Sequence, residues 1–265
     1  MSEYTIERGF GVRERMDLLA NNHAAGTTGL LDLLGSPTAG AHCIDLGCGG
    51  GHVALELGRR TGAAGRVVGI DLDTELLELA RKAAAAQSLD HVTFRQGAVE
   101  DIADTDFDLA YARMLLSHLN DPETMIERMS AAVRPGGMVV VEDVNFAGCF
   151  TEPECPAYDR WVNWFSVAVH RTGGDLDIGP RLPGLLREAG LIDVGVRVAQ
   201  PVYTDGPEKQ LQQLSMEKVR AAILSAGLVD AHEYDAAHSE LKAFTDDPTT
   251  VVASPRMIQA WGRKP

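Results

Sequence analysis

Short apolar runs alternate with longer amphipathic stretches through the first half of the chain. The apolar runs predict strands at residues 42–46, 67–70, 92–95, 107–111 and 138–142. Between them, apolar positions recur at the spacing of helices that bury one face. Strands that alternate with helices are typical of a parallel sheet with helices on both sides. Ligands bind to such sheets at the carboxyl ends of the strands.

Two of the predicted helices have clear start signals. Asp73 is placed to cap the helix that follows the second strand. Asp121 and Pro122 begin another, because Asp is a favoured cap and Pro fits the first helical position. This second helix is predicted to run to about Val133.

The pattern differs on either side of this alternating region. Residues 1–40 read as helical, and residues 146–190 read as loop and helix with many aromatic side chains. The remaining elements that we predict are a strand at 191–203, helices at 208–226 and 230–244, and a last strand at 251–261. We expect one domain over residues 1–265, made of a helical lid (1–40), a core (41–145), a helical cap (146–190) and C-terminal strands and helices (191–265).

Composition and charge exclude several classes of protein. The 265 residues suit one large α/β domain, and no apolar run is long enough to cross a membrane, so we expect no membrane insertion. The four cysteines are too few and too irregular for a disulfide framework or a zinc site, and the N-terminus does not resemble a secretory signal, so we expect a cytoplasmic protein. A net charge of −14 disfavours nucleic-acid binding, which normally needs a basic surface.

The most informative segment is CIDLGCGGG, at residues 43–51, where an apolar strand runs into a glycine cluster. A glycine turn lets the backbone approach a ligand closely. Asp71 lies 20 residues after Gly51, at the end of the apolar run VVGID. An acid at this distance is placed to accept hydrogen bonds from a ribose. The segment therefore predicts a cofactor that contains a nucleoside.

Two classes of cofactor fit a glycine turn after the first strand. Gly49, Gly51 and Ala54 satisfy the dinucleotide pattern G-x-G-x-x-A, which places a pyrophosphate at a helix N-terminus. Asp45, however, stands at the strand end, where its charge would repel a pyrophosphate. The same acid suits a cofactor that carries an amino group and a sulfonium.

The glycine segment resembles the first motif, (E/D)-x-G-x-G-x-G, of the class I S-adenosylmethionine (SAM) methyltransferases. Residues 107–110, FDLA, resemble the fourth strand of this family, and residues 134–137, RPGG, resemble the turn before its fifth strand. Over residues 40–145 the chain is most similar to the small-molecule methyltransferases of the ubiquinone and menaquinone biosynthesis type. The resemblance implies an α/β fold with a Rossmann-like, doubly wound, mostly parallel seven-stranded sheet, an N-terminal helical lid, and helical insertions after strands 5 and 6.

The resemblance also implies the residues that bind the cofactor. Asp45 would lie beside the amino end, Asp71 would bind the ribose hydroxyls and Leu72 would lie against the adenine. The full set that we expect is Asp45, Gly47, Cys48, Gly49, Gly51, Asp71, Leu72, Ala98, Val99, Glu100 and Arg113.

Two of these assignments leave alternatives open. Many relatives carry Gly-Asp after strand three, and the Asp carboxylate accepts a hydrogen bond from the adenine amino group. Here Ala98 follows Gly97 and cannot accept this bond. Glu100, Asp101 or the Val99 backbone would have to accept it instead. Arg113 is placed to bind the SAM carboxylate or a substrate anion, or else only to pair with a surface acid.

The residues expected near the methyl acceptor are Met114, His118, Glu142, Tyr158, Trp161 and Phe165. His118 has the right chemistry for a general base, with an ordinary pKa of about 6.5, although a histidine beside a helix is often structural. Glu142 could orient a hydroxyl or amine, or simply end its strand. Tyr158, Trp161 and Phe165 share one helical face, which could line a pocket or pack in the core.

The function predicted from the sequence is methyl transfer from SAM, which leaves S-adenosylhomocysteine (SAH), to a small, hydrophobic or planar molecule by in-line displacement. Proximity and exclusion of water would be the main catalytic effects, and no metal is expected. The alternatives are a SAM-binding enzyme with other chemistry, a nicotinamide-dependent oxidoreductase and a non-catalytic binding module. The acceptor atom and the oligomeric state are not encoded in any pattern that we recognise.

Overall fold

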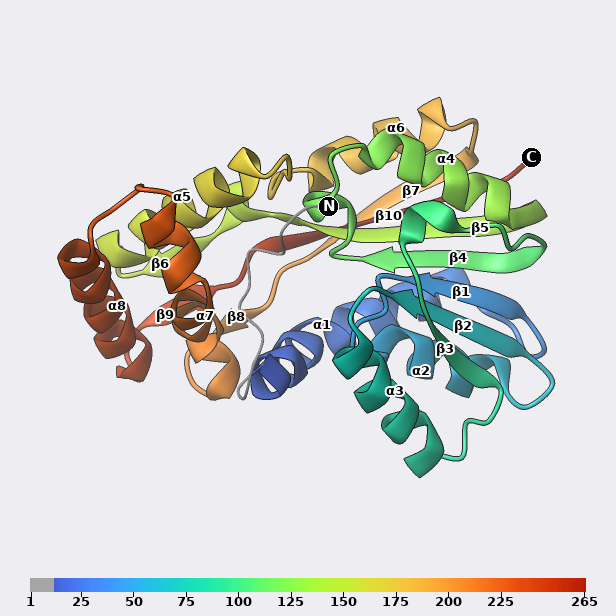
Figure 1. Cartoon of the computed structure of the whole chain (residues 1–265), viewed down its shortest axis with the longest axis horizontal. Coiled ribbons are helices and arrows are strands. Elements are labelled where there is room, and N and C mark those ends of the chain that lie inside the picture. Colours follow the sequence, from blue (N-terminus) through green and yellow to red (C-terminus); the bar gives the residue numbers. More distant parts are fainter. Residues whose placement is uncertain (1–11) are drawn as a thin grey trace. The chain divides into compact units, whose positions relative to one another are not determined.

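Seven strands form the main sheet of the protein, in the order β3-β2-β1-β4-β5-β10-β7 (Figure 1). The structure is a computed structural model that describes residues 12–265, with side chains described from Leu18 onward. The strands are β1 (His42–Leu46), β2 (Arg66–Asp71), β3 (Val92–Gln96), β4 (Phe107–Arg113), β5 (Val133–Asn145), β7 (Ile192–Ala199) and β10 (Arg256–Arg263). The Rossmann-like sheet expected from the sequence is confirmed.

The parallel part of the sheet determines where a ligand can bind. β1 pairs in parallel with both β2 and β4, β2 pairs with β3, and β4 pairs with β5. Successive strands therefore place their carboxyl ends along one edge. The strand order reverses between β1 and β4, and ligands of open α/β sheets bind at this kind of switch point.

The helices are α1 (Val12–Leu34), α2 (His52–Thr61), α3 (Thr74–Ala86), α4 (Pro122–Ala132), α5 (Pro156–Arg171), α6 (Leu182–Glu188), α7 (Leu211–Ser225) and α8 (Ala231–Asp246). Within the part of the chain that the structure describes, none of them is long and apolar enough to cross a membrane. The predicted caps are confirmed: the Asp73 side chain accepts from the backbone N–H of Glu75 and Leu76, and Asp121 accepts from that of Thr124. These bonds satisfy backbone donors that the first turn of a helix leaves unpaired.

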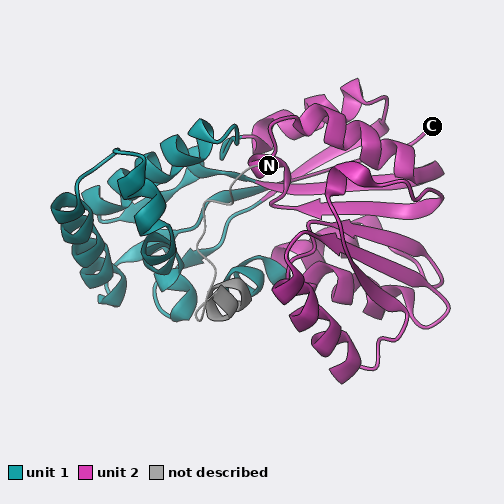
Figure 2. Cartoon of the chain, in the orientation of Figure 1, with its two compact units in different colours: residues 1–24, 144–177, 199–257 teal, residues 25–143, 178–198, 258–265 magenta. Residues whose placement is uncertain are grey.

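The chain forms two compact units, which are coloured separately in Figure 2. Unit 1 comprises residues 1–24, 144–177 and 199–257, and unit 2 comprises residues 25–143, 178–198 and 258–265. Both are assembled from segments that are distant in the sequence. The single domain predicted above, with its lid and cap, stays a prediction, and residues 1–11 of that lid lie outside the described residues.

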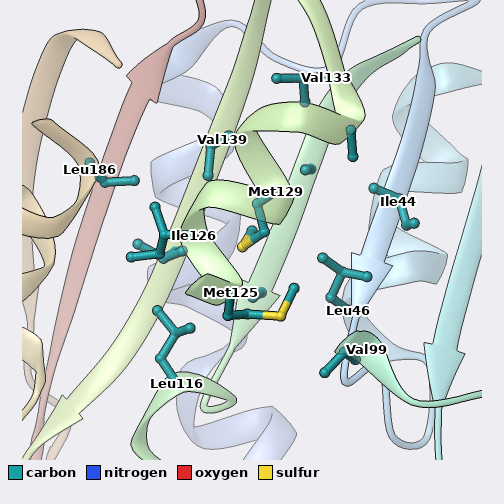
Figure 3. Packing of buried hydrophobic residues seen from close by; sticks show 14 of the residues in the cluster. Ile44, Leu46, Val99, Leu116, Met125, Ile126, Met129, Val133, Val139 and Leu186 are labelled. Atoms are coloured by element: carbon teal, nitrogen blue, oxygen red, sulfur yellow. The ribbon is translucent and has the colours of Figure 1, made fainter. Parts of the chain in front are cut away.

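Unit 2 contains the main sheet with a hydrophobic layer on each side. On one side, α4 and α6 pack on the sheet through residues such as Met125, Ile126 and Leu186, and Figure 3 shows these side chains within one cluster with Ile44 of β1 and Val139 of β5. On the other side, apolar residues of α1, α2 and α3 cover the sheet. The even-numbered residues Ile44 and Leu46 of β1 face the first layer, and Cys43 faces the second, because side chains alternate along a strand.

Unit 1 combines a small sheet with α5, α7 and α8. Its strands are β6 (Phe150–Glu152), β8 (Val202–Tyr203) and β9 (Val251–Ala253), in the order β6-β9-β8, and both pairings are antiparallel. The rings of Trp164 on α5 and Tyr234 on α8 stack with their centroids 5.6 Å apart. Aromatic packing of this kind supplies much of the core of a small unit.

Two predicted strands are interrupted in the structure. The segment expected as one strand at 191–203 is divided into β7 and β8, and the segment at 251–261 is divided into β9 and β10. Pro201 and Pro255 lie at the two interruptions. Proline has no backbone N–H to donate to a ladder, so Pro255 cannot continue β9 and β10, which both have neighbours on two sides. β7 and β8 are edge strands, where proline is tolerated, and at Pro201 the chain passes from the main sheet to the small one.

Candidate functional site

The turn between β1 and α2 is built on glycines that take left-handed backbone conformations. The φ angles of Gly47, Gly49 and Gly51 are 67°, 49° and 82°. Side-chain-bearing residues rarely adopt such angles. A Cβ atom on Gly51 would also lie 2.8 Å from Cβ of Ala80 and 2.9 Å from a ring carbon of Phe94. The turn therefore needs glycine both for its conformation and for its close contact with α3 and β3.

Cys48 fills the space beneath this turn. It is buried, and its Sγ would lie 2.9 Å from a Cβ atom placed on Gly69 of β2. Burial raises the pKa of the Cys48 thiol, because a thiolate would be stripped of water there. Cys48 thus supports the turn as a neutral packing group, and its expected contact with the cofactor stays a prediction.

Asp71, at the end of β2, is connected to the glycine turn by hydrogen bonds. Its Oδ2 accepts from the backbone N–H of Gly49 at 2.7 Å, and its Oδ1 accepts from the backbone N–H of Asp73 at 2.9 Å. The carboxylate is therefore held in one orientation between β1 and β2. It is only partly buried, so it remains accessible to a ligand.

Asp45 is the most unusual group of the site. It is 2% exposed, and its Oδ2 has no hydrogen-bond partner within residues 12–265. Burial raises its pKa to about 7, against the opposing effects of Arg113 and of a hydrogen bond from the backbone of Ala54. A buried carboxylate oxygen without a partner is costly, so this position is prepared for a cationic or hydrogen-bond-donating ligand.

The expected adenine end is formed by residues that follow β2 and β3. Leu72 is 61% exposed, which is unusual for a large apolar side chain and leaves its surface open to a flat ring. Ala98 precedes a short 3₁₀ turn, Val99–Asp101. The Val99 side chain is part of the core in Figure 3, so only its backbone is placed to face a ligand, whereas Glu100 is exposed.

Three of the expected residues lie at or just after the end of β4, where Arg113 is the last residue of the strand. Arg113 is partly buried, and Met114 has a φ of 52°, which is strained for a residue with a side chain. The Met114 backbone N–H donates to the carbonyl of Glu142 at 2.8 Å, which continues the pairing with β5. His118 ends the 3₁₀ turn Leu116–His118 and is partly buried.

Asp143 holds the turn that carries His118. Its side chain is buried, and Oδ2 accepts from the backbone N–H of Ser117 at 3.1 Å. Glu142 and Asp143 are consecutive residues of β5, so their side chains point to opposite faces of the sheet.

Glu142 is 1% exposed and lies in a hydrogen-bond network that no sequence motif indicated. Its carboxylate accepts from the hydroxyls of Thr27 and Tyr111 and from the side-chain amide of Gln259. With these bonds occupied, Glu142 is better placed to position its neighbours than to contact an acceptor directly. The sequence showed these polar residues within apolar segments, but it did not show that they would contact one another.

Tyr158, Trp161 and Phe165 belong to α5 in unit 1. The Tyr158 hydroxyl donates to the carbonyl of Ala253 at 2.8 Å, and Nε1 of Trp161 donates to the side chain of Gln212 at 3.1 Å. Trp161 and Phe165 stack with centroids 4.9 Å apart. All three are buried in the core of unit 1, and their expected contact with an acceptor stays a prediction.

The residues of unit 2 fit SAM as a ligand. The unpartnered oxygen of buried Asp45 suits an ammonium group, and the fixed carboxylate of Asp71 suits a pair of hydroxyls. Gly47, Gly49 and Gly51 present backbone without side chains at the end of β1, and the exposed Leu72 offers an apolar surface for a base. Parallel pairing brings these groups to one edge of the sheet.

Part of the chain is similar in sequence to known methyltransferases. The ubiquinone biosynthesis O-methyltransferase of Alkalilimnicola ehrlichii is 35% identical over 109 residues, which are 40% of this chain and 42% of that protein. The match thus spans less than half of the length of this curated relative.

Solved structures with the same fold cover far more of the chain. The YcgJ protein of Bacillus subtilis superposes with a TM-score of 0.60 at 17% identity, covering 91% of this chain and 100% of that one. Phosphoethanolamine N-methyltransferase 2 of Haemonchus contortus, in complex with phosphomonomethylethanolamine and SAH, has a TM-score of 0.57 at 18% identity and covers 91% of this chain and 52% of that one.

The family match is the decisive comparison. Residues 37–177 match the family described as a methyltransferase domain, which is 141 of the 265 residues. The resemblance inferred from the motifs is confirmed. The chain belongs to the methyltransferase domain family.

Proposed function

We propose that the protein transfers a methyl group from SAM to a small, hydrophobic or planar molecule. The observation that carries this proposal is the pair of acids at adjacent strand ends. Asp45 offers a buried oxygen without a partner, and Asp71 offers a carboxylate fixed by two backbone N–H groups. The small planar acceptor is supported by the relative from Alkalilimnicola, which is named as acting in ubiquinone biosynthesis.

The chain's own residues would act mainly by binding and orientation. SAM, when bound, supplies a methyl group that is activated by the adjacent positive sulfur. The glycine turn, Asp45 and Asp71 hold the cofactor in one position, so that the acceptor only has to be aligned with it. His118 is our candidate to take a proton from a hydroxyl acceptor, since it lies on a turn that Asp143 fixes through Ser117.

Incubation with methyl-labelled SAM and a panel of phenols, catechols and quinols tests the proposal. We expect one class of acceptor to be methylated with SAH formed in equal amount. Conversion of an acceptor without SAH would instead indicate a SAM-binding enzyme with other chemistry. Tight binding of NADH with no binding of SAM or SAH would favour the oxidoreductase that the glycine pattern also allows.

Asp71→Ala is expected to weaken SAH binding by at least roughly tenfold, because a charged hydrogen bond contributes about 1.5–3 kcal/mol. Isothermal titration calorimetry measures the effect. The matched control is Asp73→Ala, which removes the helix cap but keeps the backbone N–H that donates to Asp71. The control should lower thermal stability and leave the affinity for SAH close to that of the wild type. Equal affinities of Asp71→Ala and wild type would reject the ribose role.

His118→Ala is expected to reduce turnover of a hydroxyl acceptor by roughly a hundredfold, which is within the usual range for loss of a general base. The affinity for SAH should stay unchanged, because the proposed role concerns only the acceptor proton. The measurement is the rate of methyl transfer at saturating SAM, over a range of pH values. If turnover is normal, or if SAH binding falls equally, His118 is not the base.

A further inference from the structure

A hydrogen-bonded chain of side chains connects α1 to the ends of β4 and β5. The Thr27 hydroxyl donates to Oε1 of Glu142 at 2.6 Å. The same hydroxyl accepts from Nη1 of Arg113 at 3.2 Å. Arg113 and Glu142 are direct partners in the parallel pairing of the two strands, so both side chains leave the same face of the sheet.

Neighbouring groups determine which side chain donates and which accepts in each hydrogen bond of this network. Burial and the nearby charge of Glu142 raise the pKa of Tyr111 well above its usual value, so its hydroxyl stays protonated and donates to Glu142. Gln259 donates to the other oxygen of Glu142. Thr27 has a single hydroxyl proton, which it gives to Glu142, and its lone pairs then face the Arg113 guanidinium.

This arrangement leaves most of the Arg113 guanidinium for another partner. Among the contacts within the described residues, the bond to Thr27 uses one of five N–H donors, and the side chain is only partly buried. The positive charge of Arg113 acts on Asp45, whose Oδ2 lacks a hydrogen-bond partner in the described part of the chain. The carboxylate of Asp45 and the guanidinium of Arg113 therefore lie in one site, and each still has hydrogen-bonding groups that a ligand can use.

An α-amino acid carries the matching pair of charges, an ammonium and a carboxylate on the same carbon. An ammonium suits Asp45, and guanidinium groups bind carboxylates through two parallel hydrogen bonds, which makes Arg sensitive to its orientation. A guanidinium held by Thr27 loses less side-chain freedom on binding than a mobile one, so the ordering cost of binding is smaller.

We propose that Thr27, anchored by Glu142, is a positioning residue that holds Arg113 to bind the carboxylate of the cofactor's amino-acid moiety. This inference rests on the proposed function, because it requires SAM or SAH in the site. It makes Thr27 and Arg113 determinants of selectivity for the carboxylate, in addition to the affinity that Asp45 and Asp71 supply.

The test compares two ligands by calorimetry: SAH and its decarboxylated analogue, which keeps the adenosine, the thioether and the amino group. The wild type should bind SAH at least roughly tenfold more tightly than the analogue, since the two differ in one charged contact. Arg113→Gln should remove this preference by weakening SAH alone. Thr27→Val, which keeps the side-chain volume, should reduce the preference by roughly fivefold, and Thr27→Ser should restore it.

Each outcome decides between specific alternatives. Equal binding of both ligands by the wild type overturns the inference while leaving the proposed function in place. A parallel loss of both ligands in Arg113→Gln or Thr27→Val shows a general structural role and also overturns it. Failure of the wild type to bind either ligand rejects the proposed function itself. If Thr27→Val fails to fold, the affinities of Arg113→Gln and Thr27→Ser for the two ligands still test the inference, because Arg113 is only partly buried.

Discussion

Gly49→Val is expected to lower the affinity for SAH by more than roughly a hundredfold, or about 2.7 kcal/mol. Gly49 has a φ of 49°, and its backbone N–H donates to Asp71. A β-branched side chain strongly disfavours this backbone conformation, so the turn must rearrange and release the Asp71 carboxylate. Calorimetric titration with SAH measures the loss.

Gly62→Val provides a matched control for this result. Gly62 also has a positive φ, of 64°, and an added Cβ would meet no atom of the described chain within 4 Å. It follows the last residue of α2, whereas the glycine turn precedes the first, so the two positions lie at opposite ends of that helix. The control should lose stability to a similar extent but keep its affinity for SAH. If both variants bind SAH as the wild type does, the backbone of the turn does not approach the cofactor.

Asp45→Asn is expected to stabilise the ligand-free protein and, at the same time, to weaken SAH binding by roughly a hundredfold. The pKa of Asp45 is raised to about 7 from an ordinary value of 3.8, so the fold disfavours the ionised form. Ionised Asp45 therefore reduces the free energy of unfolding at pH 8 by up to about 4 kcal/mol, at 1.36 kcal/mol per pKa unit. Asparagine keeps an oxygen for the Ala54 backbone and removes this cost. Thermal unfolding without ligand and calorimetry with SAH measure the two effects.

The pH dependence of stability and of SAH affinity in the wild type tests whether the charge of Asp45, and not a change in packing, causes these two effects. A raised carboxyl pKa means that the stability associated with Asp45 is fully present below about pH 4 and is lost as the pH rises through about 7. The affinity for SAH should change in the opposite direction and increase between pH 5 and 7, because only the ionised carboxylate attracts the ammonium. Arg113, Asp71 and Glu142 are the charged groups that act on Asp45. Asp45→Asn should abolish most of the pH dependence, and an unchanged profile in this variant would assign it to another group.

Local chemistry in the sequence was sufficient for the core elements and for the position of the site. The glycine turn, the helix caps at Asp73 and Asp121, and Asp71 at the end of β2 all depend on residues that are close together in the chain. Because the carboxyl ends of parallel strands share one edge of the sheet, finding the strands also located Asp45, Asp71 and Arg113 at that edge. Local patterns failed at 191–203 and 251–261, where each predicted strand is divided between the two sheets. At Pro255 the missing N–H ends the pairing of interior strands, whereas at Pro201 the strands are at the sheet edges.

The sequence by itself thus determined the sheet and the family, because backbone conformation and hydrophobic period are properties of neighbouring residues. Only the tertiary structure decided that Glu142 is buried among Thr27, Tyr111 and Gln259, and that one oxygen of Asp45 has no partner in the described chain. These facts depend on contacts between residues up to 117 positions apart, such as Gln259 and Glu142. Burial and hydrogen bonding between such distant residues arise from packing, and no periodicity in the chain records which polar side chains will meet.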